Sequence, residues 1–96
     1  MLQAACEAME RGRCREVYYD EHSVIGEVHV VGLNKAHKPA VLLFEKFDTA
    51  REHCGEWRFL PLDDAREIDV SGYFSDAPRP GYRRSDERFE MILCAL

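Results

Sequence analysis

The stretch Val24-Ile25-Gly26-Glu27-Val28-His29-Val30-Val31-Gly32-Leu33 decides the fold, because half of its residues are Val or Ile. Such β-branched residues lose side-chain freedom in a helix and pack well on a pleated sheet, so the stretch predicts a strand. Residues two apart in a strand project from the same face, which places Glu27 and His29 together. That pair could share a proton or fix one imidazole tautomer.

Further segments on either side also have the composition or the alternation of strands, at residues 14–20, 40–47, 56–62 and 66–71. Polar turns separate these segments at intervals of about 10–12 residues, which is typical of small barrels and sandwiches. Apolar residues recur upstream with helical spacing at Leu2, Ala5, Cys6 and Met9, and Gly12 follows as a stop signal. The sequence therefore predicts a mainly β (α+β) fold, a five-stranded SH3-like or Sm-like barrel with an N-terminal helix.

A chain of 96 residues is expected to form a single domain. It would comprise a helix over residues 1–12, barrel strands over 13–72, and a Pro/Arg loop with an apolar C-terminal segment over 73–96. The net charge of −5 excludes a broad cationic surface for duplex DNA but leaves room for a local basic groove. The first residues lack a signal-peptide pattern, and no apolar run approaches the ~20 residues of a membrane span. A cytoplasmic location without membrane contact is expected.

The four cysteines, at positions 6, 14, 54 and 94, have no metal-binding or C-x-x-C spacing. In a cytoplasmic protein this pattern favours four reduced, mostly buried thiols, and the alternatives are a disulfide, a redox role or a zinc site built with histidines. No metal and no cofactor are expected. Gly-rich phosphate loops and nucleophile elbows are both missing from the sequence, so an enzyme is the least favoured class.

Alternation in the fourth predicted strand puts Arg58 on the face opposite Trp57 and Phe59. If those two aromatic residues belong to the core, Arg58 points outward and could join Glu27 and His29 in one polar patch. The alternative is a solvated strand face with incidental charges.

The segment Ala77-Pro78-Arg79-Pro80-Gly81-Tyr82-Arg83-Arg84 combines three arginines, one aromatic ring and two prolines that stiffen the backbone. Guanidinium groups beside an aromatic ring are typical of sites for phosphates and stacked bases. The same groups could instead clasp the loop to the acidic surface of its own domain. Downstream, residues 89–96 are apolar and fit either a helix or a strand, and we favour a strand or a partner-contacting segment.

Four stretches together resemble the WYL domain, in particular its small stand-alone versions. They are Arg15-Glu16-Val17-Tyr18-Tyr19 after the predicted helix, Glu27-Val28-His29 with Gly32, Trp57-Arg58-Phe59 with Leu62-Asp63, and Pro78-Arg79-Pro80-Gly81-Tyr82 with Asp86. The tripeptide that names the family falls near Ala40-Val41-Leu42, where only the leucine is kept.

The resemblance implies an SH3-like or Sm-like barrel that acts as a non-enzymatic, ligand-sensing regulatory module in transcription or phage defence. The implied ligands are a nucleotide or a short single-stranded nucleic acid. The implied site residues are Tyr19, Glu27, His29, Arg58, Arg79 and Tyr82. Arg58 and Arg79 would meet an anionic group, His29 would donate or accept a hydrogen bond, and Tyr82 would stack.

Two other function classes stay open. One is an interaction module that forms a homodimer, or binds a partner regulatory protein, through residues 89–96 or an exposed edge strand. The other is a small hydrolase or redox enzyme, which would need a perturbed Cys or His in a cleft.

Overall fold

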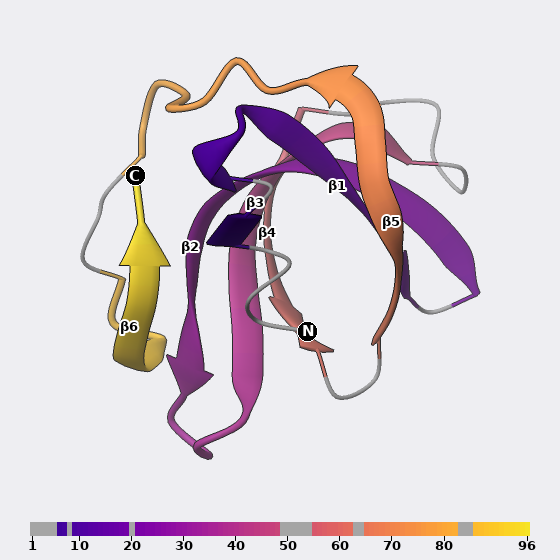
Figure 1. The fold of residues 1–96 in the computed structure, drawn as a ribbon. Helices are drawn as coiled ribbons and strands as arrows, with labels where there is room; N and C mark the ends of the chain where they lie inside the picture. Colours follow the sequence, from indigo (N-terminus) through magenta and orange to yellow (C-terminus); the bar gives the residue numbers. More distant parts are fainter. Residues whose placement is uncertain (1–5, 8, 20, 49–54, 63–64, 83–85) are drawn as a thin grey trace.

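The computed structural model describes residues 6–7, 9–19, 21–48, 55–62, 65–82 and 86–96. Six strands make up this part of the chain (Figure 1). They are β1 (Arg13–Tyr19), β2 (His22–Asn34), β3 (Pro39–Asp48), β4 (Trp57–Pro61), β5 (Ala65–Phe74) and β6 (Phe89–Ala95). The strand predictions are confirmed, including the strand that was favoured for the C-terminal segment.

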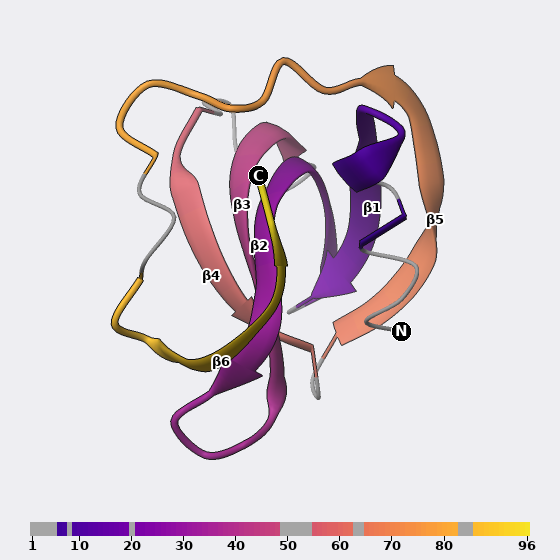
Figure 2. The ribbon, with the colours of Figure 1, turned by 60° about the vertical axis from the view of Figure 1, so that its left-hand side comes forward.

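β2 is the central strand of one antiparallel sheet with the order β4-β3-β2-β1-β5. β3 follows β2 along one edge, from Val24 to Leu33. The other edge is shared, because β1 pairs with residues 22–26 of β2 and β6 pairs with residues 30–34. Figure 2 shows β6 beside the second half of β2. Between the two pairings lie Glu27, Val28 and His29, the residues on which the candidate site is built.

Both faces of the sheet are buried, each by its own hydrophobic cluster. One cluster is formed by Met9, Val17, Val24, Val28, Val31, Val41, Leu43, Leu60 and Leu62. The second contains Val30, Ala40, Leu42 and Phe89, with Trp57, Phe59, Tyr82 and Ala95 packed against it. β6 approaches β2 closely at Gly32, where an added Cβ would lie 2.1 Å from the Met91 carbonyl oxygen. A side chain at this position would push β6 away from the sheet.

The predicted N-terminal helix is wrong. Residues 1–5 and 8 lie outside the described residues, and the described part of 6–12 is a single helical turn closed by the Arg11 amide on the Glu7 carbonyl at 3.0 Å. Met9 is buried in the first cluster, and Cys6 packs against that cluster. Of the residues with helical spacing, the structure describes Cys6 and Met9, which pack this turn against the sheet, and the described part of the fold is all-β.

The predicted closed barrel is also wrong, because the sheet is open. β4 pairs with β3 and β5 pairs with β1, and no pairing joins β4 to β5 within the described residues. Strand spacing indicates a β fold, whereas closure of a barrel depends on contacts between the two strands at the ends of the sheet. The sixth strand, which the predicted five-stranded barrel does not include, pairs with the central β2. It therefore does not join the two end strands, β4 and β5.

The prediction of four reduced thiols is wrong for two of the cysteines. Cys6 and Cys94 form a disulfide across a sequence separation of 88 residues. Cys14 is free and buried, and its Sγ donates to the Phe74 carbonyl at 3.5 Å. Cys54 lies outside the described residues. No helix in the described part of the chain is long and apolar enough to cross a membrane.

Candidate functional site

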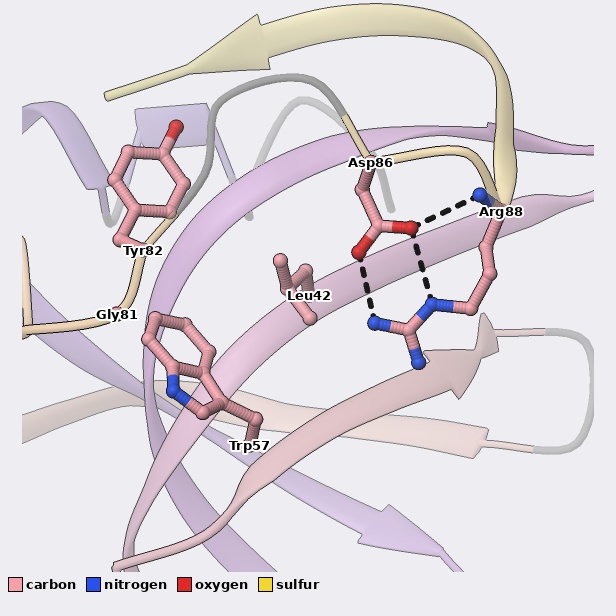
Figure 3. Close-up of a pocket in the computed structure, with 6 residues that line it drawn as sticks. All are labelled: Leu42, Trp57, Gly81, Tyr82, Asp86 and Arg88. Carbon is pink, nitrogen blue, oxygen red and sulfur yellow. Dashed lines mark hydrogen bonds and ion pairs between the residues drawn. The ribbon is translucent and has the colours of Figure 1, made fainter.

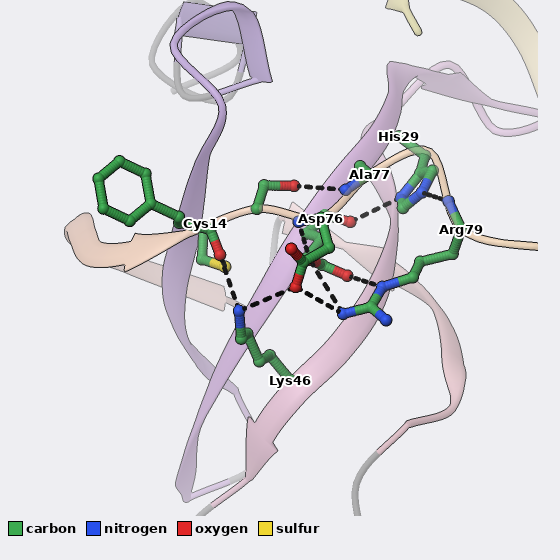
Figure 4. Close-up of polar contacts among 9 residues, drawn as sticks. Cys14, His29, Lys46, Asp76, Ala77 and Arg79 are labelled. Carbon is green, nitrogen blue, oxygen red and sulfur yellow. Dashed lines mark hydrogen bonds and ion pairs between the residues drawn. The ribbon is translucent and has the colours of Figure 1, made fainter.

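Residues 75–82, here called the strap, run along one end of the sheet from β5 toward β6 (Figures 1 and 2). The strap is held by side chains of β2. The Asp76 amide donates to Glu27 Oε2, and the Arg79 amide donates to His29 Nε2 at 3.0 Å (Figure 4). Glu27 and His29 are both fully buried. Two backbone donors of an irregular segment are thus satisfied by two side chains of the central strand.

The Arg79 side chain closes the same cluster. Its guanidinium pairs with both oxygens of Glu27 and with Asp76 Oδ2 at 3.2 Å, and it lies over the Phe44 ring. Lys46 Nζ reaches Asp76 Oδ2 at 3.3 Å and the Phe74 carbonyl at 2.8 Å. The charges of this cluster are therefore matched within the protein. The hydrogen bond that Arg79 donates to Glu27, together with the negative charges of Glu27 and Asp76, raises the pKa of Arg79 above its usual value.

The hydrogen bonds of His29 define its protonation state. Nδ1 lies 2.8 Å from the Glu27 carbonyl oxygen, which can only accept, so Nδ1 carries the proton. Nε2 accepts from the Arg79 amide, so this nitrogen is unprotonated. Burial lowers the pKa of His29 below its usual value of 6.5, against an opposing contribution from Glu27 and with a further lowering by Arg79. The ring is a neutral imidazole near neutral pH.

Arg58 does not join this cluster. In the strand register Arg58 lies opposite Leu43, and Trp57 lies opposite Phe44. Phe44 in turn pairs with Glu27, so Trp57 shares a face with Glu27 while Arg58 lies on the other face. There it forms an ion pair with the fully buried Glu45. The predicted polar patch of Glu27, His29 and Arg58 is wrong, because both faces of the sheet are covered and alternation alone cannot separate inside from outside.

An aromatic pocket lies next to the His29 ring. That ring is 4.6 Å from Trp57 and 5.0 Å from Tyr82, between centroids. The Trp57 and Tyr82 rings are nearly parallel, at an interplanar angle of 22° and a centroid separation of 6.3 Å. These two rings line a pocket of about 270 Å³ together with Leu42, Gly81, Asp86 and Arg88.

Figure 3 shows the two rings at one side of the pocket, the Asp86–Arg88 pair at the other, and Leu42 between them. Arg88 binds both carboxylate oxygens of Asp86, at 3.0 and 2.8 Å, and lies over the Phe59 ring. The guanidinium lowers the pKa of Asp86 below its usual value, so the carboxylate stays ionised. The pocket thus offers flat apolar surfaces and one fixed ion pair.

Most of the predicted site residues do come together: Glu27, His29 and Arg79 form the polar cluster, and Tyr82 links it to the pocket. The side chain of Tyr19 and the residues Arg83 and Arg84 lie outside the described part of the chain. Sequence reasoning did not select Leu42, Trp57 or Arg88 for the site. Two signals were available: Trp57 is the single tryptophan, and Arg88 follows Asp86 at the spacing of a short ion pair.

Within the described residues, no group of three His, Cys, Asp or Glu side chains could hold a metal ion. Cys14 is a poor nucleophile, because burial, reinforced by the charge of Glu27, raises its pKa to about 11.

Comparisons with protein-family models, with curated proteins and with solved structures give no match to this chain, so the resemblance to WYL domains stays a prediction.

Proposed function

We propose that this protein is a non-enzymatic ligand-binding module whose aromatic pocket takes the base of a nucleotide, or one base of a short single-stranded nucleic acid. The observation that carries the proposal is the pocket of Leu42, Trp57 and Tyr82 with Arg88 at its far side. Bases stack on aromatic side chains with little sequence preference, and an arginine suits the attached phosphate.

The size of the pocket supports a single base. Sites for drug-sized ligands usually span about 300–1,000 Å³, and this one has about 270 Å³. Its near-parallel Trp57 and Tyr82 rings offer surfaces for one flat ring system. A net charge of −5 disfavours long nucleic acids, whereas a single nucleotide needs only a few cations.

Arg88 takes the role that was expected of Arg58 and Arg79. Those two arginines hold the fully buried carboxylates of Glu45 and Glu27. The Arg88 side chain is 54% exposed, and its bonds to Asp86 use only part of its N–H groups. We therefore assign the anionic group of the ligand to Arg88 and the stacking to Trp57 and Tyr82.

Trp57 gives a direct test, because it is the only tryptophan and it lines the pocket. Its fluorescence is followed while AMP, GMP, CMP, UMP, the corresponding nucleosides, inorganic phosphate and a short oligothymidylate are titrated. We expect a saturable change with at least one nucleotide and none with phosphate alone. Tyr82→Leu should weaken binding of nucleotide and nucleoside alike, and Arg88→Gln should weaken only the nucleotide, by about tenfold.

The matched control is Lys35→Gln, which removes the same charge from a side chain that pairs with Glu90 outside the pocket. Unchanged nucleotide affinity in both Tyr82→Leu and Arg88→Gln, or no saturable signal with any nucleotide, contradicts the proposed function.

A second candidate function is an interaction module that pairs with a second copy of itself through β6. The specific observation is that β6 and the residue after it expose apolar side chains, at Met91, Ile92, Leu93 and Leu96. Light scattering tests this candidate. A wild-type dimer that Leu93→Lys converts to a monomer, while Phe74→Lys at another exposed apolar residue does not, supports it; a wild-type monomer contradicts it.

The resemblance to WYL domains adds to the proposal a regulatory role in transcription or phage defence. The protein would exert that role through a partner protein. A cytoplasmic location is likewise proposed. The Cys6–Cys94 disulfide opposes that location, because cytosolic thiols are usually kept reduced. Recovery of the protein in the cytosolic fraction of its own cells, judged against compartment markers, would support it, and recovery outside that fraction would contradict it.

A further inference from the structure

We propose that His29 is a proton-sensitive latch, which holds the strap and the Tyr82 wall of the pocket while its ring is neutral and releases them when the ring is protonated. The latch itself rests on the geometry of the strap. Only its consequence for ligand affinity rests on the proposed function.

The strap depends on β2 side chains for its position. It belongs to no strand of the sheet, and its Asp76 and Arg79 amides donate to Glu27 and His29. The Tyr82 amide donates to the Arg79 carbonyl at 3.1 Å, which ties the pocket wall to the residue that His29 holds. The Tyr82 hydroxyl donates to the Leu96 carbonyl at 3.0 Å. Release of the Arg79 amide therefore loosens the turn that carries Gly81 and Tyr82.

The ring can hold the strap in only one protonation state. A second proton would have to bind Nε2, the nitrogen that accepts from the Arg79 amide. Two N–H groups would then face each other at 3.0 Å, and a buried amide would lose its acceptor. The imidazolium would also be fully buried, since the His29 side chain has no exposed surface in the closed form.

The surrounding charges do not rescue a protonated ring. Glu27 is the nearest carboxylate, but Arg79 already binds both of its oxygens. Asp76 on the strap is bound by Arg79 and by Lys46 of β3. The other side chains around the ring are uncharged near neutral pH: the Trp57 indole of β4 and the Tyr82 phenol of the strap. On the far side of Glu27 lies the buried Cys14 thiol of β1. Opening the strap exposes the ring to water, which solvates its charge.

The sign of the pH effect follows from this arrangement. An exposed ring has its ordinary pKa of about 6.5, whereas burial lowers the pKa in the closed form. Below that pH the open form binds a proton that the closed form refuses, so the opening equilibrium rises by up to about tenfold per pH unit. By linkage, a ligand that needs the closed Tyr82 wall competes with the proton.

Amide hydrogen exchange measures the latch directly, without any ligand. Between about pH 7.5 and 5.5, and after correction for intrinsic exchange, we expect protection of the Arg79 and Asp76 amides to fall by up to about tenfold. The Leu43 amide, in the core of β3, should keep its protection. The matched variant is His29→Gln, whose side-chain oxygen can accept from Arg79 without titrating, and it should abolish the pH dependence.

A pH-independent Arg79 amide in the wild type, or the same fall in His29→Gln, overturns the latch. If His29→Gln does not fold, the ring is titrated by NMR in the wild type. Chemical shifts of the Arg79 amide that follow the His29 titration support the latch, and independent shifts overturn it.

The consequence for binding is tested separately, with whichever nucleotide quenches Trp57. As the pH falls from about 7.5 to 5.5, its Kd should rise more in the wild type than in His29→Gln, because protonation of the nucleotide phosphate, whose second pKa is about 6, affects both proteins alike. If no nucleotide binds at any pH, the proposed function is contradicted while the exchange experiment still decides the latch. Conversely, pH-independent exchange with intact nucleotide binding removes only the latch.

Discussion

The polar cluster under the strap and the aromatic pocket beside it lie on the same face of the sheet and meet at the His29, Trp57 and Tyr82 rings. Their chemistry is opposite. In the cluster, Glu27, His29 and Arg79 bind one another, and the Arg79 side chain is only 29% exposed. In the pocket, Arg88 keeps exposed N–H groups next to open aromatic surfaces. Charged residues that lie close together can thus serve only to hold a segment of the fold in place. A binding surface requires that such groups remain accessible to a ligand.

Because of this difference, substitutions in the two regions should affect different properties of the protein. Changes in the cluster, or in the covalent link that holds the sheet around it, should lower stability. A change at Arg88 in the pocket should lower affinity and leave stability nearly unchanged, whereas Leu42, Trp57 and Tyr82 also pack in the second hydrophobic cluster. Measuring both stability and affinity for each variant therefore distinguishes the two regions.

The Cys6–Cys94 disulfide should give the largest effect on stability. It fastens the N-terminal turn to β6 and closes a loop of nearly the whole chain. Removing the bond with Cys6→Ser and Cys94→Ser should lower the free energy of unfolding by about 4 kcal/mol, because the unfolded chain gains loop entropy. Urea unfolding of the oxidised wild type and the double variant measures the difference. The variant Cys14→Ser controls for loss of a buried thiol, and an equal loss in both variants would assign the effect to packing.

Glu27→Ala should follow, with a loss of about 3 kcal/mol. The substitution removes a fully buried carboxylate and leaves the Arg79 guanidinium and the Asp76 amide without their main partner. Chemical unfolding provides the measurement. Glu90→Ala breaks an exposed pair with Lys35 and should cost less than about 1 kcal/mol. Similar losses of stability in the two variants would mean that the Glu27 cluster does not hold the strap in place.

The pH dependence of stability should be smaller again. Since the folded pKa of His29 lies below its unfolded value, the unfolded state binds more protons as the pH falls through about 6.5. Stability should therefore be full above that pH and fall by up to about 1.4 kcal/mol per unit below it, until the folded pKa is reached. The measurement is the wild-type curve minus the His29→Gln curve above about pH 5, where carboxylates stay ionised. If the wild type instead gains stability relative to His29→Gln as the pH falls, His29 is protonated in the folded state and the prediction is contradicted.

The two regions also differ in how far they could be predicted from the sequence. The strands could be predicted from local signals, such as the Val-rich run around Glu27 and His29. The position of these two residues on one face follows from the same run. The Arg79 loop was noted for its chemistry, and the clasp was one of two alternatives left open. Partners far apart in the chain were not accessible: Cys6 with Cys94, Arg58 with Glu45 on the second buried face, and the open edges of β4 and β5. The pocket was missed because it forms only where β3, β4 and the segment after β5 meet.

The smallest effect on stability is expected at Arg88. Its pair with Asp86 joins residues two apart, and the Arg88 side chain is 54% exposed, so Arg88→Gln should change the free energy of unfolding by about 1 kcal/mol or less. The same variant removes the only charged donor that the described pocket residues present to a ligand, and nucleotide affinity should fall about tenfold. Measuring unfolding and Trp57 titration on one preparation compares the two losses. A large loss of stability with unchanged affinity would make the Asp86–Arg88 pair a second clasp, and the distinction between the two regions would no longer hold.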